Sequence, residues 1–204
     1  MDTVRSFLDL ADPRGLKAAL SVSPQLVDIP VPDGDHAPHP IHAVCDRVFD
    51  GRLSEADGLA LAEVLISAGA DLTHRHPGNG DSLVTTAISL AAPSIAHALL
   101  DAGAPCEIKG LFGARPLHWA AIMGMPDLLE RLLPGADLTE RDSEFASTPL
   151  GWALEGWASP PKGSQGGQIV CAAALVEAGA IVEAQWRESA RVKQDYALSA
   201  ALRL

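Results

Sequence analysis

The stretch ARPLHWAAIMGMPDLLERLLPGADL, residues 114–138, decides the fold class of this chain. Pro116 suits the first turn of a helix, where its missing N–H costs nothing, and small apolar residues follow it at helical spacing. Gly124 and Pro126 then break the chain before a second run, which carries leucines three and four residues apart. Gly135 permits the left-handed turn that ends a helix. The stretch therefore predicts two short helices joined by a tight turn.

The same organisation recurs along the chain. A Gly-Ala pair follows an apolar run at Gly69, Gly103, Gly135 and Gly179, at intervals of 34, 32 and 44 residues. A second pattern precedes each pair, and it reads HPIHAVC (39–45), SLVTTAI (82–88), RPLHWAA (115–121) and TPLGWAL (148–154). Two patterns that recur together near one period indicate a repeat protein.

These patterns resemble ankyrin repeats, in which Thr-Pro-Leu-His-x-Ala-Ala opens the first helix and Gly-Ala-Asp closes the second. Residues 115–138 match best, and the resemblance covers residues 35–183. It implies an all-α fold, namely an ankyrin-repeat solenoid of stacked helix-turn-helix units with short hairpin fingers. Physical reasoning agrees, because one two-helix unit cannot bury its own apolar face and must stack on its neighbours.

We expect a single domain, residues 1–204, in which the terminal segments cap four repeats. The predicted segments are an N-terminal capping half-repeat (1–34), repeat 1 (35–73), repeat 2 (74–106), repeat 3 (107–139), repeat 4 (140–183) and a C-terminal helical cap (184–204). Repeat 4 carries an inserted loop, 159–168, whose Pro, Gly and Ser content predicts a mobile surface segment. Pro134 should shorten the second helix of repeat 3.

Composition argues against several classes of function. The net charge is −11 and the pI about 4.9. This balance argues against nucleic-acid or anionic-membrane binding, which needs clustered Lys and Arg, and it favours basic or neutral partners. The chain has no signal-peptide pattern and no apolar run of about 18 residues. Three separated cysteines, Cys45, Cys106 and Cys171, complete the expectation of a reduced cytoplasmic protein without a cofactor.

Two tryptophans one period apart are the first candidates for a binding site. Trp119 and Trp152 occupy the same repeat position, so stacked units should place their indole rings together on the concave side. The pair is either an aromatic platform for a partner or a filling of the space between repeats. Met123 follows Trp119 at a position that the resemblance leaves variable and exposed. Trp157 should lie near the root of the inserted loop, as a lid or as a packing residue.

The expected fingers supply further candidates. Phe112 and Phe145 lie on neighbouring fingers, and Asp142 and Glu144 stand beside the second of them. The two phenyl rings either contact a partner or pack against each other and stiffen the fingers.

Catalytic signals are weak. Glu155 lies three residues after Trp152, so the two should share one helix face. A carboxylate beside two indoles is either an acid or base with a raised pKa or a solvated helix residue. No catalytic residue is assigned.

Histidines gather on the first two expected fingers, at His36, His39, His74 and His76. Imidazole is a suitable zinc ligand, so a surface zinc site is a third hypothesis. No Cys-x-x-Cys or His-Glu-x-x-His motif accompanies these residues, and no metal ligand is assigned. His42 and His118 fall on the motif histidine of the resemblance, which implies a structural hydrogen bond to a neighbouring turn.

Two functional hypotheses follow. The leading one is a protein–protein interaction module that holds a partner on its concave face and finger loops. The alternative is a small-molecule-binding protein or unusual enzyme with a pocket in repeats 3 and 4 around Trp119, Trp152 and Glu155. A pocket larger than a few hundred Å³ favours the alternative, whereas a flat groove favours the protein partner.

Overall fold

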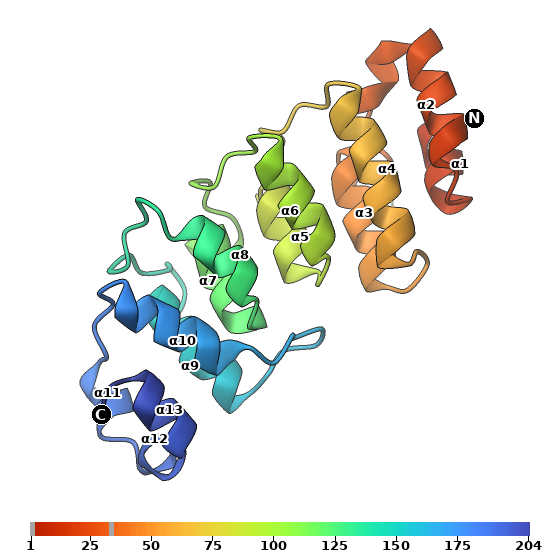
Figure 1. Cartoon of the computed structure of the whole chain (residues 1–204). Coiled ribbons are helices and arrows are strands. Elements are labelled where there is room, and N and C mark those ends of the chain that lie inside the picture. Colours follow the sequence, from red (N-terminus) through yellow and green to blue (C-terminus); the bar gives the residue numbers. More distant parts are fainter. Residues whose placement is uncertain (1–2, 33–34) are drawn as a thin grey trace. The chain divides into compact units, whose positions relative to one another are not determined.

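The computed structural model describes residues 3–32 and 35–204 of the chain. Every regular element in these ranges is a helix, so the predicted all-α fold is confirmed (Figure 1). The chain divides into two compact units, Met1–Leu111 and Phe112–Leu204. The short 3-10 helix η2 (Leu111–Gly113) contains the point in the sequence at which they divide.

The first unit is built of three layers of paired helices. Its elements are α1 (Thr3–Asp9), α2 (Pro13–Val22), η1 (Pro24–Asp28), α3 (Pro40–Phe49), α4 (Glu55–Ser67), α5 (Leu83–Ser89) and α6 (Pro93–Asp101). Helix α3 pairs with α4, and α5 pairs with α6. Like helices of successive pairs then pack on one another, with α3 against α5 and α4 against α6, while α1 and α2 cover α3 and α4.

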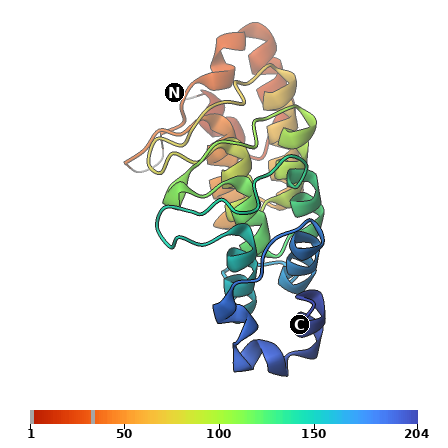
Figure 2. The same ribbon diagram turned by 90° about the vertical axis from the view of Figure 1, so that its left-hand side faces the viewer.

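The second unit repeats this arrangement and adds a helical end. Its elements are α7 (Pro116–Met123), α8 (Pro126–Leu132), α9 (Pro149–Ala158), α10 (Gln168–Glu177), α11 (Ala184–Arg187), α12 (Ala190–Gln194) and α13 (Tyr196–Ala201). Helix α7 packs on α8 and α9, and α10 packs on α8 and α9. Helix α13 covers α10, as a terminal cap requires. In Figure 2 these elements follow one another from the green to the blue part of the chain.

Matching corners confirm the repeat. Gly69, Gly103, Gly135 and Gly179 each follow the second helix of a pair, with φ of +88°, +82°, +78° and +104°. A glycine is required at such a corner because only glycine adopts this backbone without strain. Each predicted repeat contains one helix pair, although the repeat boundaries themselves stay predictions.

The core of each pair consists of small aliphatic side chains. In α7, Ala120 and Ala121 are fully buried, and in α8 the leucine stripe at 128, 129 and 132 faces inward. Helix α8 ends at Leu132, two residues before Pro134, in agreement with the predicted shortening. Small residues on the first helices allow their backbones to approach closely.

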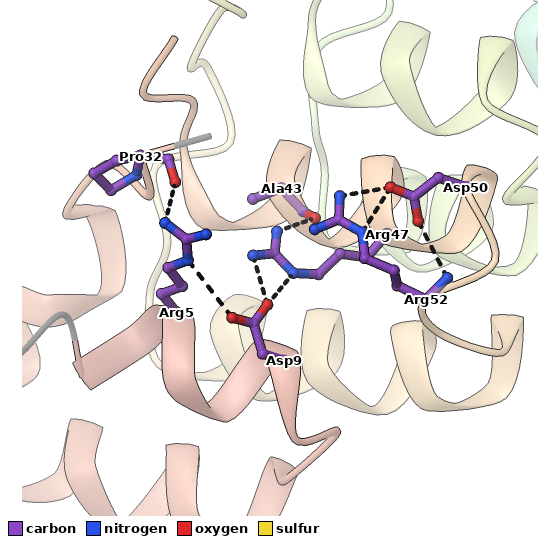
Figure 3. A network of polar contacts seen from close by, with 7 residues as sticks. All are labelled: Arg5, Asp9, Pro32, Ala43, Arg47, Asp50 and Arg52. Carbon is purple, nitrogen blue, oxygen red and sulfur yellow. Dashed lines mark hydrogen bonds and ion pairs between the residues drawn. The ribbon is translucent and has the colours of Figure 1, made fainter. Parts of the chain in front are cut away.

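A buried arginine ties the N-terminal helices to the first full pair. The side chain of Arg47 on α3 has no exposed surface, and its Nε and Nη2 lie 2.9 and 2.8 Å from Asp9 Oδ1 on α1 (Figure 3). Its Nη1 donates to the carbonyl of Ala43 at 2.9 Å. Arg5 donates to the carbonyl of Pro32 at 3.1 Å, so the same cluster also holds the chain that leads out of the half-repeat.

The inserted loop is bound to the end of α7. Helix α10 begins at Gln168, so the non-helical part of the predicted insertion ends at residue 167. Gln165 N donates to the carbonyl of Met123 at 2.8 Å, and Gln168 Nε2 donates to that of Ile122 at 3.0 Å. The insertion therefore satisfies the last carbonyls of α7, which have no partner within their own helix.

We predict that Gly156→Ala destabilises the fold although alanine favours helices. A Cβ at position 156 on α9 would lie 2.4 Å from the carbonyl oxygen of Ile122 on α7, so the two helices must move apart. We expect a loss of about 1–3 kcal/mol in the free energy of unfolding, measured in urea. Gly151→Ala on the same helix is the control, because its Cβ meets only the rotatable Ser147 hydroxyl and should be nearly neutral. Equal losses in the two variants would contradict the packing described here.

Candidate functional site

A cleft of about 680 Å³ lies within the second unit. Helices α7 and α9, the finger between α8 and α9, and the segment before and within α11 form its walls. The lining residues are Phe112, Trp119, Ile122, Arg141, Phe145, Ala146, Ser147, Trp152, Glu155, Glu183 and Gln185. Its volume lies within the range of roughly 300–1,000 Å³ that is typical of ligand pockets.

Four aromatic rings form one wall of the cleft. The rings of Trp119 and Trp152 are 5.1 Å apart and nearly perpendicular, so the spacing of one period does place them together. The ring of Phe112 lies 5.2 Å from Phe145, 6.2 Å from Trp119 and 6.5 Å from Trp152. The two phenyl rings thus pack against each other and also line the cleft. Mutual packing, one of the two alternatives considered from the sequence, therefore does not exclude contact with a partner, which is the other.

Phe112 holds its central place in a strained conformation. Its φ of +62° lies in the left-handed region, which is costly for a residue with a side chain. Ser143 on the neighbouring finger secures it, because Ser143 N and Oγ donate to the carbonyl of Phe112 at 2.7 and 2.8 Å. The finger that carries Phe145 therefore fixes the backbone that carries Phe112.

Asp142 organises this finger and does not offer its carboxylate to a partner. It is buried, and it accepts hydrogen bonds from the backbone N–H groups of Glu144, Phe145 and Ser147. Its Oδ2 also accepts from Trp152 Nε1 at 2.9 Å. Burial by itself would raise the pKa of Asp142, but these hydrogen bonds outweigh it and hold the pKa below its ordinary value. The prediction of Asp142 as a contact residue was wrong.

The two tryptophans differ in how their N–H groups are satisfied. Trp152 is only 4% exposed, and its bond to Asp142 fixes it as a structural wall of the cleft. Trp119 is half-buried, and its Nε1 is buried without an acceptor among the described residues. An N–H without a protein acceptor stabilises the fold less than the bonded N–H of Trp152 does.

The charged groups of the cleft are unevenly paired. Arg141 donates to Glu183 and to the carbonyl of Ala146, and Gln185 Nε2 donates to Glu183 Oε2 at 3.1 Å. The exposed carboxylate of Glu155 makes no hydrogen bond or ion pair with the described residues. The negative charge of Glu155, beside the aromatic wall, therefore has no ion-pair partner among the described residues.

Three other predicted contact residues lie outside the cleft. Met123 is 1% exposed and belongs to the core, so the prediction of an exposed anchor was wrong. Trp157 packs away from the cleft, where Nε1 donates to Asp195 Oδ2 at 3.1 Å beneath the guanidinium of Arg191. Glu144 is exposed but does not line the cleft.

Sequence reasoning missed Glu183 and Gln185 as lining residues. Gln185 stands six residues after Gly179, as Arg141 stands six after Gly135. The two residues therefore follow successive Gly-Ala corners at the same offset, Arg141 on a finger and Gln185 in α11, and this offset was the signal that would have identified Gln185. Glu183 had no such signal, because its pairing with Arg141 arises only when the fingers lie side by side.

The histidines of the first unit do cluster, as predicted, but through ring contacts. His36 and His42 lie 5.8 and 5.2 Å from His76, and His39 lies 5.0 Å from His74. Among residues 3–32 and 35–204, no group of three or more His, Cys, Asp or Glu side chains is arranged to hold a metal ion. His42 Nδ1 shares a hydrogen bond with Thr86 Oγ1 at 2.9 Å, and His118 Nε2 with the carbonyl of Glu140 at 3.3 Å. The His118 contact reaches the backbone of the neighbouring finger, as the resemblance implied, whereas His42 bonds a side chain on α5.

The fold defines a helical-repeat protein made of paired helices. One of its repeats matches the ankyrin-repeat family model, over residues 112–143, which span α7, α8 and the first part of the finger. Part of the chain is also similar to the E3 ubiquitin-protein ligase KEG of Arabidopsis thaliana, with 29% identity over 121 residues. That match covers 59% of this chain and 7% of the ligase. No helix within the described ranges is long and apolar enough to cross a membrane.

We predict that acid weakens the first unit through its buried histidines. Burial lowers the pKa of His42 from 6.5 to about 3 and also lowers that of His39. Between these values the unfolded chain binds more protons than the folded chain, so stability is complete above about pH 6.5 and falls as the pH decreases. The urea midpoint should therefore drop between pH 7 and pH 5. His42→Gln should flatten this dependence, and an unchanged slope in that variant would contradict the assignment.

We predict that replacing each tryptophan by phenylalanine changes the free energy of unfolding by different amounts. Trp119→Phe removes a buried donor without an acceptor and should change the free energy of unfolding by less than about 1 kcal/mol. Trp152→Phe removes a hydrogen bond to a buried carboxylate and should cost about 1–3 kcal/mol. Urea denaturation of both variants makes the comparison. Equal losses would show that the two indoles are held in the same way.

Proposed function

We propose that this chain is a protein-binding module that takes up an exposed segment of a partner in the aromatic cleft of its second unit. Ankyrin repeats are protein–protein interaction modules, because stacked repeats present a rigid surface for recognition. The observation that carries the proposal is the gathering of four aromatic rings, three of them partly exposed, around one cleft.

The rings at the mouth of the cleft have the properties of interaction hot spots. Phe145 is 62% exposed, and Phe112 and Trp119 are half-buried, so a partner has apolar surface left to cover. Partly buried aromatic residues in pockets dominate the binding energy of many interfaces. Asp142 and Ser143 fix the finger beneath these rings, which lowers the entropy lost on binding.

The similarity to an E3 ubiquitin-protein ligase does not extend the proposal to ubiquitin transfer. The match covers only 7% of that protein, and a small shared region carries none of the remaining activity with it. We therefore limit the proposal to recognition of a partner.

A small-molecule ligand is the second candidate function. The volume of the cleft favours it, because a flat interaction surface does not need an apolar pocket of this size. The same lining residues serve both candidates, so the distinction rests on whether a peptide or only a compound fills the cleft.

A library of displayed random peptides, selected on the full chain, tests the proposal. We expect peptides to be enriched, and Phe145→Ala should weaken them about tenfold, which corresponds to a moderate hot spot. Tyr196→Ala is the matched control, because Tyr196 is an aromatic residue 88% exposed on α13 and outside the cleft. Enriched peptides whose affinity is unchanged by Phe145→Ala would overturn the proposed site. Failure to enrich peptides, with a compound stabilising only the intact cleft, would favour the second candidate.

A further inference from the structure

The cleft has an unbalanced charge beside its aromatic wall. Of its two carboxylates, Glu183 already accepts from Arg141 and Gln185. Glu155 stands on α9 one turn after Trp152 and has no partner among the described residues. A partner group that enters the cleft therefore meets apolar rings and one available negative charge.

The rings of Phe112 and Trp119 are nearly parallel, with 25° between their planes, whereas the rings of Trp152 and Phe145 lie at 54–73° to their neighbours. Their centroids are 5.1–6.5 Å apart, which is the distance at which aromatic rings contact one another directly. No group can enter between rings that are already in contact, so a partner group must bind on their exposed side. A planar cation that stacks on the exposed side of the wall fits this geometry.

The same unit already contains such a pairing. The guanidinium carbon of Arg191 lies 4.6 Å from the ring centroid of Trp157, two residues after Glu155 on α9. In the cleft itself, the guanidinium of Arg141 lies beside Glu183. Guanidinium groups thus bind both an indole face and a carboxylate in the surroundings of α9.

We infer that the cleft recognises an arginine side chain of the partner, whose guanidinium stacks on the Phe112–Trp119 side of the aromatic wall and binds the carboxylate of Glu155. This inference rests on the proposed function and specifies the chemistry of the partner at that site. Arginine fits better than lysine, because its planar fork both stacks on aromatic rings and matches a carboxylate with two parallel hydrogen bonds. The net charge of −11 adds long-range attraction for a basic segment.

Peptides enriched on the full chain supply the test. We expect a recurrent arginine in peptides that compete for the cleft, and its replacement by citrulline, which keeps the shape and removes the charge, should weaken binding about tenfold. Lysine at this position should weaken it as well, because it keeps the charge and loses the planar fork.

Glu155→Gln provides the reciprocal measurement on the protein. It should remove most of the difference between the arginine and citrulline peptides, since the carboxylate that distinguishes them is gone. Glu177→Gln is the control, because it removes the same charge from an exposed position on α10 outside the cleft and should leave the difference intact.

The outcomes separate this inference from the proposed function. Peptides that need Phe145 but lack arginine, or that bind equally with citrulline, overturn the inference and leave the proposed function standing. A preference for arginine that survives Glu155→Gln also overturns it. Enriched peptides that ignore Phe145→Ala overturn the proposed function and the inference together.

Discussion

A methyl group on Gly156 would lie 2.4 Å from the carbonyl oxygen of Ile122, so α9 can rest against α7 only because this position has no side chain. That close approach brings the indoles of Trp119 and Trp152 to 5.1 Å, although they are 33 positions apart in the sequence. The aromatic wall, and the cleft beside it, are consequences of how tightly two first helices stack. Such packing is a general property of repeat proteins, in which each unit is stable only through its neighbours.

Some residues of the cleft stabilise the unit, and others lower its stability. Asp142 and Trp152 are buried and bonded to each other, and they hold the finger on α9. Phe112 has a positive φ, Trp119 has a buried N–H without an acceptor among the residues that the structure describes, and Phe145 exposes most of its side chain. Each of these three features costs free energy, and all three border the same cleft. Several destabilising features at one place are typical of a recognition site, where selection for ligand affinity outweighs selection for stability.

In the first unit, buried polar groups join helices and fingers to one another. Arg47 joins α1 to α3 through Asp9, and the histidine rings of two fingers pack on one another. These interactions stay within the unit and leave no group of ligands suited to a metal ion among the described residues. We expect the buried histidines to make the stability of this unit depend on pH, while the aromatic cleft of the second unit is the candidate for recognition.

The sequence by itself determined the fold class, because the period of Gly-Ala corners and of Pro-led helices depends on local backbone preferences that can be recognised residue by residue. It also placed Trp119 beside Trp152, because residues one repeat period apart become neighbours when the repeats stack. It did not separate Trp152 and Asp142, which stabilise the finger, from Trp119 and Phe145, which face the cleft. It left Trp157 open as a lid or a packing residue, and it expected the buried Met123 to be exposed. Only the tertiary structure decided these roles and the pairing of Arg141 with Glu183, because burial and side-chain hydrogen bonding depend on atoms that folding brings together from distant positions in the sequence.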